Sequence, residues 1–533
     1  MLTFSTNPTP ASAAPAGPGS AGWIAAVLHA DDPSVADHVA LATPTATGWQ
    51  ELTYAELDHR SAAVAAWLAR RRVAPGQRVL LHGEPSPAWV SGFFGILRAG
   101  AIAVPLDPRL TVDELAPVAA HSAPVAVLVA GGLRAVVDEI GLDADVLELE
   151  GVDGLPGAHG AEVARPAVDQ AMDDPALIVW TSGTTGRPKG VTVSYANLAY
   201  AVSRSVEVQH LDGHDRWLSV LPLNHLLELT CGLLGCLSTG ATLSFSPTLM
   251  PGEIVELLAG RRTTRMMVVP LLARLLLPEL ERNPPGHLRA LFAGGAPLAP
   301  ELVDAYAALG IPLYQGYGLS ETAPTVAMNT PDLHRRGSVG RPLPGTEVRI
   351  DRSPGHLGDD DGGEILVRSP AVMIGYWEDE TRTQEALDVD GWLHTGDLGH
   401  LDADGFLFIT GRAKDLIVLE SGKKVQPEEV EAVLQWSPLF ADVCVVGVAS
   451  TRPGRGASEQ VCAVVVPRAP MNGEEVEAEI VRLSAGLSGY KRPRLVDVWH
   501  PNASLPTTAK RSVRRVEVAR QATERLRRQR LEP

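Results

Sequence analysis

The chain has 533 residues, which is too long for one ordinary hydrophobic core, so at least two domains are expected. Its formal net charge of −17 argues against nucleic acid as a partner, because phosphate backbones attract basic surfaces. Four cysteines are too few for a disulfide framework in this length, and no pair has metal-finger spacing, which fits a reducing compartment: Cys231, Cys236, Cys444 and Cys462.

Residues 1–22 are rich in alanine, proline, serine and glycine. They lack the basic and apolar regions of a secretory signal, so we expect a disordered leader. Further along, the most apolar segments are interrupted by glycine or charge before they reach the ~20 residues that a membrane span requires. These features predict a cytoplasmic protein without a membrane span.

Helices and short apolar strands alternate from Leu52 to Val129. Residues 53–71 have the period of an amphipathic helix, residues 77–82 resemble a strand, and residues 88–108 give a helix, a glycine stop and a strand. This alternation predicts parallel sheets covered by helices.

A glycine-rich loop follows the apolar run Ala176–Trp180, which is typical of a buried strand. The loop reads Thr181-Ser-Gly-Thr-Thr-Gly-Arg-Pro-Lys-Gly190. Its glycines allow backbone N–H groups to approach a ligand, and its hydroxyls and cations can bind phosphate oxygens. It is not a Walker A loop, because no hydroxyl follows Lys189 to hold a metal. A solvated turn of small polar residues is the alternative interpretation.

The remaining elements are expected in the following order. Ser194 is the predicted N-cap of a helix. Beyond Gly337 the pattern changes to strands joined by an Asp404-Gly405 hairpin turn, and then to a smaller α/β unit that starts with a helix at Pro427. The other predicted helices span 251–259 and 300–309 and start near Glu474, and the other predicted strands span 289–292, 364–368, 406–409, 443–448 and 461–466.

The loop resembles the phosphate loop of the adenylate-forming superfamily, which includes acyl-CoA synthetases, firefly luciferase and peptide-synthetase adenylation domains. Further strings resemble that superfamily in the right order, over roughly Thr53 to Arg515. They are weak singly and specific together. Pro222-Leu-Asn-His225 resembles the acyl-pocket string, Gly294-Gly-Ala296 and Tyr317-Gly-Leu-Ser-Glu-Thr322 resemble the adenine and metal strings, and His394-Thr-Gly-Asp397 resembles the ribose string. Gly411-Arg-Ala-Lys-Asp415 resembles the hinge, which Gly422-Lys-Lys-Val-Gln-Pro427 follows, and Leu505-Pro-Thr-Thr-Ala-Lys510 resembles the terminal lysine motif.

The resemblance implies an α/β fold. A large N-terminal domain of stacked mixed sheets with helices and a small β-barrel-like part would be followed by a small, mobile α+β domain. The expected limits are 1–22 for the leader, 23–412 for the AMP-binding domain and 413–533 for the C-terminal domain. The hinge between the two domains would lie at Lys414.

The resemblance also implies the roles of the site residues. Glu321 would hold Mg²⁺, which prefers hard oxygen ligands, and it would be catalytic together with Thr184, His225 and Lys510. A surface carboxylate and a packed histidine are the alternatives for Glu321 and His225. The residues expected to bind ATP are Thr181, Ser182, Gly183, Thr185, Gly186, Lys189, Gly294, Gly295, Ala296, Tyr317, Gly318, Ser320, Thr322, Asp397, Arg412 and Lys414.

Lys510 would be a mobile cation that pairs with the α-phosphate and the carboxylate of the acid. Glycine usually precedes this lysine in the superfamily, whereas Ala509 stands here and restricts the backbone. Arg511, the next residue, is the alternative cation.

The expected function is an ATP-dependent ligase that adenylates a small-molecule carboxylic acid and transfers the acyl group to coenzyme A. Leucines after His225 and the apolar stretch 266–277 favour a medium or long aliphatic acid, although both segments are equally typical of core and an aryl acid stays open. No carrier-protein domain follows Lys510, which predicts a stand-alone ligase. The alternatives are an AMP ligase that loads a separate carrier protein, a member with β-lactone or nitrite chemistry, a kinase-type NTPase, and an inactive interaction protein.

Overall fold

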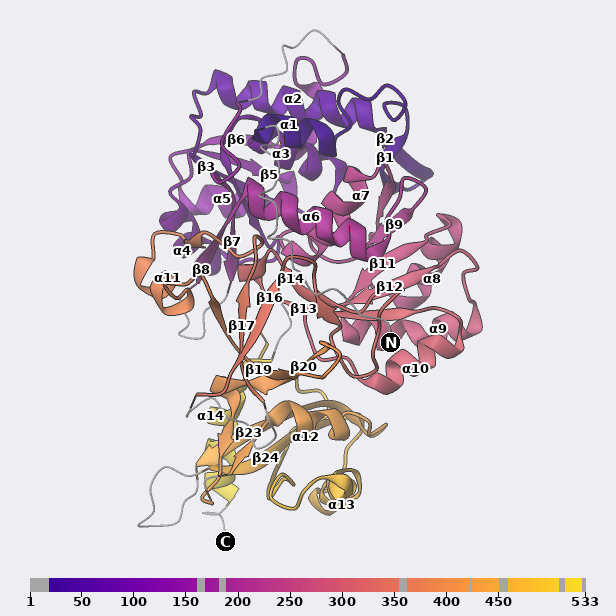
Figure 1. Ribbon diagram of the computed structural model, residues 1–533, viewed down its shortest axis with the longest axis vertical. Helices are drawn as coiled ribbons and strands as arrows, with labels where there is room; N and C mark the ends of the chain where they lie inside the picture. Colours follow the sequence, from indigo (N-terminus) through magenta and orange to yellow (C-terminus); the bar gives the residue numbers. More distant parts are fainter. Residues whose placement is uncertain are drawn as a thin grey trace, which may run out of the picture. The chain divides into compact units, whose positions relative to one another are not determined.

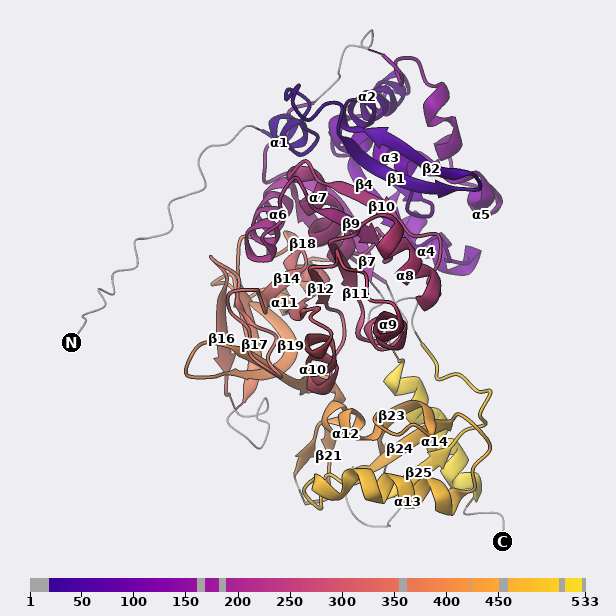
Figure 2. The ribbon, with the colours of Figure 1, turned by 90° about the vertical axis from the view of Figure 1, so that its right-hand side faces the viewer.

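The computed structural model describes residues 19–160, 168–181, 188–353, 362–421, 423–449, 459–507 and 513–529 (Figures 1 and 2). Its contacts divide the chain into two units. The larger comprises Met1–Glu347 and Val367–Leu393, and the smaller comprises Val348–Leu366 and His394–Pro533. This mixed α/β architecture confirms the predicted fold class. The predicted domain limits at 22 and 412 stay predictions.

One sheet of the larger unit has seven strands in the order β18-β8-β7-β4-β3-β5-β6. Its parallel part confirms the alternation expected from the sequence, because helices connect the strands. The strands are β3 (Arg78–His82), β4 (Ile102–Leu106), β5 (Ala126–Val129), β6 (Asp145–Glu148), β7 (Pro175–Thr181), β8 (Lys189–Ser194) and β18 (Gly375–Tyr376), and the helices are α2 (Tyr54–Arg70), α3 (Pro87–Arg98), α4 (Val112–Ser122) and α5 (Arg134–Ile140). The strands β8 and β18 are antiparallel to their neighbours.

A second sheet has nine strands in the order β15-β14-β13-β12-β11-β9-β10-β1-β2. Its six inner strands, from β13 to β1, are parallel, and antiparallel strands complete both edges. The strands are β1 (Val39–Thr45), β2 (Gly48–Thr53), β9 (Arg216–Ser219), β10 (Thr242–Phe245), β11 (Arg265–Val268), β12 (Ala290–Ala293), β13 (Leu313–Gly318), β14 (Thr325–Met328) and β15 (Arg341–Pro342).

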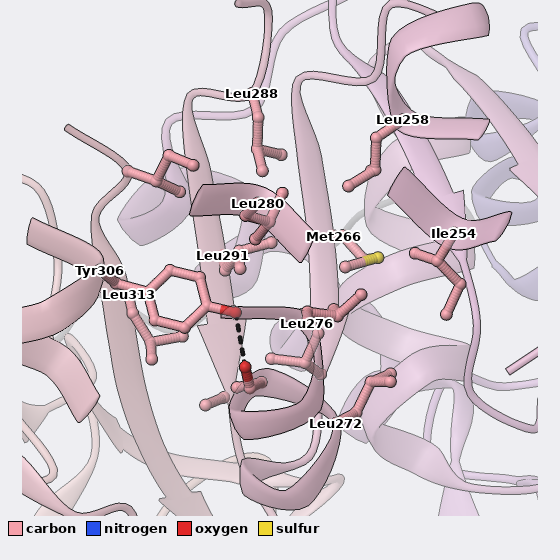
Figure 3. Close-up of a cluster of buried hydrophobic side chains, with 14 of the residues drawn as sticks. Ile254, Leu258, Met266, Leu272, Leu276, Leu280, Leu288, Leu291, Tyr306 and Leu313 are labelled. Carbon is pink, nitrogen blue, oxygen red and sulfur yellow. Dashed lines mark hydrogen bonds between the residues drawn. The ribbon is translucent and has the colours of Figure 1, made fainter. Parts of the chain in front are cut away.

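Side chains alternate between the two faces of this second sheet. Leu218, Met266 and Leu291 are register partners on β9, β11 and β12, and they face a buried core together with α8 (Pro251–Gly260), α9 (Pro270–Arg282) and α10 (Pro300–Ala308). Figure 3 shows this cluster, in which the Tyr306 hydroxyl donates a hydrogen bond of 2.7 Å to the Ala273 carbonyl oxygen. Apolar side chains between 266 and 277 therefore fill core, with Leu272 and Leu276 among them.

The predicted helix starts are confirmed where a cap marks them. Thr53 and Glu56 form a capping box at the start of α2, and the Ser194 side chain accepts from the Asn197 N–H at the start of α6 (Tyr195–Gln209). Helix α1 (Ser20–Val27) begins inside the segment predicted as a leader, whose residues 1–18 lie outside the described residues.

The smaller unit holds most of a four-stranded sheet in the order β16-β17-β19-β20. The predicted hairpin turn before β20 is confirmed: the Gly405 N–H donates to the Asp402 carbonyl oxygen, and Gly405 has a φ of +80°. The four strands are β16 (Glu347–Asp351), β17 (Gly363–Arg368), β19 (Leu393–Leu401) and β20 (Leu407–Arg412).

The rest of the smaller unit includes a three-stranded sheet with helices, as the sequence pattern predicts, and a two-stranded sheet of β21 (Ile417–Val418) and β22 (Lys424–Val425). The three-stranded sheet consists of β23 (Phe440–Ala449), β24 (Glu459–Pro467) and β25 (Leu495–Val498), with α12 (Pro427–Leu434), α13 (Gly473–Leu483) and α14 (Arg515–Gln529). Apolar side chains of α12, α13, β23 and β24 form one core cluster, and α14 packs with the strands in another.

All four cysteines are buried and free of disulfides, as expected. Burial raises the pKa of each of their thiols. Among the described residues, no helix has the length and apolar character needed to cross a bilayer.

Candidate active site

The predicted phosphate loop joins two antiparallel strands. Thr181 at the end of β7 lies opposite Lys189 at the start of β8, and its hydroxyl donates to the Lys189 carbonyl oxygen over 3.5 Å. The loop therefore connects the two strands of a hairpin. β-Branched residues after Lys189 account for the strand, because Val191, Thr192 and Val193 favour extended backbone. Ser182, Gly183, Thr184, Thr185 and Gly186 lie outside the described residues.

Lys189 meets the predicted metal ligand. Its Nζ lies 2.6 Å from Glu321 Oε1 and 2.6 Å from the Tyr376 hydroxyl, and that hydroxyl donates to the same Glu321 oxygen over 2.8 Å. The ammonium also lies 4.4 Å from the centre of the Tyr376 ring. Two residues predicted from separate strings thus come together, and Tyr376 joins them as a residue that the sequence analysis missed.

Backbone pairing positions this trio. Tyr376 lies on β18 opposite Val191 of β8, and the Trp377 N–H donates to the Gly190 carbonyl oxygen over 2.7 Å. Glu321 lies in a short 3₁₀ turn (Ser320–Thr322) after β13, and its carbonyl oxygen accepts from the Met373 N–H over 2.9 Å. The segment 373–377 is therefore tied to both the phosphate hairpin and the metal string.

The charge of Glu321 fits a cation site. Burial alone would raise the pKa of this carboxyl, but the Lys189 ammonium and the hydrogen bonds from Lys189 and Tyr376 outweigh burial and hold the pKa below its usual value. The Lys189 ammonium takes the position of a cation on an anionic oxygen, which is the donor type that Mg²⁺ prefers. No cluster of three or more His, Cys, Asp or Glu that could hold a metal occurs in the described part of the chain.

The two adenine-segment strings lie at the ends of neighbouring parallel strands. Gly294, Gly295 and Ala296 follow β12, while Tyr317 and Gly318 end β13, which pairs with β12 in register. Carboxyl ends of adjacent parallel strands are where such sheets bind ligands. A Cβ at Gly318 would lie 1.7 Å from the Pro324 carbonyl oxygen, so this position requires glycine.

Ser320 and Thr322 flank Glu321 in its turn. Ser320 is partly exposed, whereas Thr322 is buried. The Thr322 hydroxyl donates to the Leu319 and Pro324 carbonyl oxygens at 3.0 and 2.9 Å. These bonds shape the turn that holds Glu321, which gives Thr322 a structural part beside the predicted ATP contact.

The acyl-pocket string ends at a π-helix. His225 is half-buried just before η3 (Leu227–Leu234). The Leu227 side chain lies so close to Gly294 that a Cβ there would meet Leu227 Cδ2 at 3.1 Å. The structure therefore places the start of η3, just after the string Pro222–His225, beside Gly294. π-Helical turns of this kind are frequent at functional sites.

Within the smaller unit, the two predicted ribose contacts form a pair. Asp397 on β19 lies opposite Arg412 on β20, and the Arg412 Nε lies 2.8 Å from Asp397 Oδ1. Asp397 is buried and Arg412 is half exposed. Lys414 follows in a 3₁₀ turn (Ala413–Asp415), and Lys510 lies outside the described residues.

We expect Asp397→Asn to raise the KM for ATP about tenfold, because hydrogen bonds to a charged acceptor contribute about 1.5–3 kcal/mol. The reason is that an amide accepts the two ribose hydroxyls less well than a carboxylate. Initial rates at varied ATP check this expectation, with Asp404→Asn in the exposed hairpin turn as the control. A KM equal to that of the control would remove Asp397 from the nucleotide site.

Comparison with known proteins identifies the family of this chain. The model of the AMP-binding enzyme family matches residues 29–377, and that of the AMP-binding enzyme C-terminal domain matches residues 414–527. The chain belongs to the AMP-binding enzyme family. The predicted membership of the adenylate-forming superfamily is thereby confirmed, and this AMP-binding enzyme is an acid–thiol ligase.

Relatives of this AMP-binding enzyme cover most of its length. A feruloyl-CoA synthase from Amycolatopsis sp is 33% identical over 498 residues, covering 90% of this chain and 96% of the relative. The long-chain-fatty-acid–CoA ligase FadD13 from Mycobacterium tuberculosis is 31% identical over 455 residues, covering 84% and 88%. The ATP-bound structure of MatB from Rhodopseudomonas palustris is similar with a TM-score of 0.83 at 30% identity, covering 94% of this chain and 99% of MatB.

Proposed function

We propose that this AMP-binding enzyme adenylates a hydrophobic carboxylic acid with ATP and Mg²⁺ in the cytoplasm, then transfers the acyl group to coenzyme A. The products are an acyl-CoA, AMP and pyrophosphate. The observation that carries the proposal is the meeting of Lys189, from the phosphate hairpin, with Glu321, from the metal string. The CoA ligases among its relatives and the ATP-bound MatB structure support the acceptor and the nucleotide.

Charge neutralisation and positioning are what such a transfer requires. A carboxylate oxygen of the acid attacks the α-phosphorus, and pyrophosphate leaves. Lys189 would bind phosphate oxygens. Glu321 would hold Mg²⁺, whose positive charge would neutralise the leaving phosphates. Tyr317 offers a flat face for adenine, Asp397 accepts from the ribose, and Lys510 would neutralise the charge at the α-phosphate.

An aryl acid is the first candidate substrate. Three aromatic side chains form a row on the face of the nine-stranded sheet opposite its leucine-rich core: Trp217 stacks on Phe292 with ring centres 6.4 Å apart, and Phe292 lies 5.7 Å from Tyr314. The π-helix η3 borders this row, because the Trp217 Nε1–H donates to Glu228. Trp217 and Phe292 are fully buried, whereas Tyr314 is partly exposed, so Tyr314 is the ring of this row that a planar acyl group would meet. Relatives named feruloyl-CoA synthase and indoleacetate–CoA ligase, both 33% identical, support this choice.

A medium or long aliphatic acid is the second candidate. Leu227 beside Gly294 favours it, and so does the similarity to FadD13. The stretch 266–277 gives it little further support, because its buried side chains, apart from Met267, belong to the core cluster shown in Figure 3.

Pyrophosphate exchange tests the proposal. The full chain, ATP and Mg²⁺ are incubated with ferulate, indoleacetate, octanoate, palmitate or nitrite, and the exchange of labelled pyrophosphate into ATP is measured. We expect an aryl acid to stimulate exchange at least tenfold over the acid-free rate, and coenzyme A to convert the adenylate into a thioester detected by mass.

Each alternative predicts a different result in the same assay. Stronger stimulation by palmitate would identify the aliphatic candidate. Exchange without a thioester would favour a carrier-protein acceptor, and stimulation by nitrite would identify atypical chemistry. Release of ADP would indicate a kinase-type NTPase, and an absence of acid-dependent exchange would contradict the proposal and favour an interaction protein.

A further inference from the structure

We propose that Lys189 is an internal counter-ion of Glu321, and that Tyr376 is the positioning residue that keeps the two side chains paired until nucleotide and metal arrive together. The inference rests on the proposed function, because it concerns the ATP site of the ligase. It adds a coupling between the two ligands and a role for a residue outside the predicted site.

The pair is sheltered from solvent. The Glu321 side chain is 11% exposed and that of Lys189 is 26% exposed. Solvent and salt screen a sheltered ion pair less than a surface pair. The attraction between Lys189 and Glu321 therefore competes strongly with the binding of any other ion to either side chain. The single oxygen Oε1 receives both Lys189 and Tyr376.

A divalent cation and the Lys189 ammonium compete for this carboxylate. Mg²⁺ binds oxygen ligands at about 2.0–2.1 Å, so a metal on Glu321 would place two cations side by side and repel Lys189. A phosphate offers Lys189 a new partner. Nucleotide therefore draws Lys189 from Glu321 and opens the carboxylate to metal, and metal on Glu321 drives Lys189 toward phosphate.

Positive coupling between the two ligands follows from this exchange. Either ligand alone must break the Lys189–Glu321 pair and leaves one of the two side chains without a partner of opposite charge. When both ligands bind, Lys189 contacts phosphate and Glu321 contacts the metal, and these two contacts are stronger than the pair they replace. Coupling between two ligands typically amounts to 5–150-fold in affinity.

Tyr376 is placed to keep Glu321 oriented during the exchange. Its hydroxyl accepts from Lys189 and donates to Glu321, and its N–H donates to the Thr383 hydroxyl over 2.9 Å. Because β18 is held by backbone pairing with β8, removal of the hydroxyl leaves the strand in place.

Binding of ATP without metal tests the first half of the inference. Titration calorimetry in excess EDTA compares the full-length wild type with Glu321→Gln, and with Glu253→Gln on the exposed side of α8 as the control. We expect Glu321→Gln to bind metal-free ATP about tenfold more tightly than either, because Lys189 is no longer held by a carboxylate. Unchanged or weaker binding would overturn the inference.

Binding of Mn²⁺ without nucleotide tests the second half. Free Mn²⁺ is measured by electron paramagnetic resonance in the presence of wild type, Lys189→Met, Tyr376→Phe and the control Lys491→Met, which removes a lysine paired with Glu429. We expect Lys189→Met to raise the Mn²⁺ affinity about tenfold and Tyr376→Phe to raise it about threefold. The reason is that each substitution removes a hydrogen bond that occupies the Glu321 carboxylate. A variant whose Mn²⁺ affinity equals that of the control would show that its replaced residue takes no part in holding Glu321.

These measurements separate the inference from the proposed function. If the wild type binds ATP but the variants have the same ligand affinities as their controls, the counter-ion inference is wrong and the proposed function stands. If the wild type binds no ATP with or without metal, both the nucleotide site and the inference are wrong. Circular dichroism confirms that each variant is folded before it is compared.

Discussion

Replacement of Lys510 by alanine is expected to slow acid-dependent pyrophosphate exchange about 10²–10³-fold, the usual effect of removing one preorganised charge partner from a transition state. The attacking carboxylate and the α-phosphate are both anionic, so the charge that Lys510 supplies matters most while the new bond forms. Transfer from a preformed acyl-adenylate to coenzyme A should change far less, because the family resemblance implies that the lysine is withdrawn for that step.

Rapid-quench measurement of the two half-reactions checks this difference. Arg511→Ala tests the neighbouring cation, and Arg520→Ala on α14, whose guanidinium pairs with Glu517 and Glu524, is the control. If exchange survives in Lys510→Ala and is lost in Arg511→Ala, then Arg511 is the catalytic cation. Survival in both variants would contradict a role for this segment in adenylation.

The second large effect is expected at Glu228, a fully buried carboxyl within the π-helix η3. The Trp217 Nε1–H donates to its Oε1 over 3.2 Å, and Gly232 leaves room for it, since a Cβ there would lie 2.8 Å from that oxygen. Burial raises the pKa of this carboxyl to about 8, and the polar side chains beside it, Ser219 and Trp217, offset only part of the rise. The protonated form of Glu228 therefore predominates at pH 7 in the folded state.

A raised carboxyl pKa makes stability fall as pH rises. Between about pH 4.5, where the unfolded chain releases this proton, and about pH 8, the folded state holds one proton more than the unfolded state. At about 1.4 kcal/mol per pH unit, the loss from this one group is on the order of 5 kcal/mol across that window. Glu228→Gln removes the titration, so the variant should lose less stability than the wild type between pH 5 and pH 8.

Thermal unfolding at pH 5 and pH 8 measures this difference. We expect the fall in Tm between pH 5 and pH 8 to be smaller by about 5 °C in Glu228→Gln than in the wild type. The fall should be unchanged in Glu256→Gln, on the exposed side of α8. Cys231 and Cys236 are the neighbouring titratable groups, and burial raises the pKa of both thiols, so they stay neutral in this window. Equal pH dependence in all three proteins would show that Glu228 is ionised in the folded state.

Local signals were sufficient to predict much of the fold. The cap at Ser194 and the turn at Gly405 each act within four residues, and each is confirmed. The helical period over 53–71 is confirmed as well, and a capping box of Thr53 and Glu56 starts that helix. The family strings identified Lys189 and Glu321 because glycine, hydroxyl and charge occur there in an unusual order.

Tyr376 could not be predicted in the same way. It lies 55 residues from Glu321 and 187 from Lys189, and nothing in its own neighbourhood indicates a ligand. Only the pairing of β18 with β8 brings it to the site.

Glu228 was missed for the opposite reason: it lies in the apolar run after His225, where periodicity does not reveal whether one carboxyl faces solvent or protein. The apolar stretch 266–277 was likewise open between core and pocket until the packing of Leu272 and Leu276 was visible.

The burial of every cysteine has a practical consequence. Thiolates are the species that react with alkylating agents and peroxides, and Cys231, Cys236, Cys444 and Cys462 are both inaccessible and biased toward the thiol form. The native enzyme should therefore give almost no background with maleimide dyes. One cysteine engineered onto the surface of each unit would accept a fluorophore pair selectively. Energy transfer between the dyes would then test the domain movement that the resemblance implies, without first removing the natural thiols.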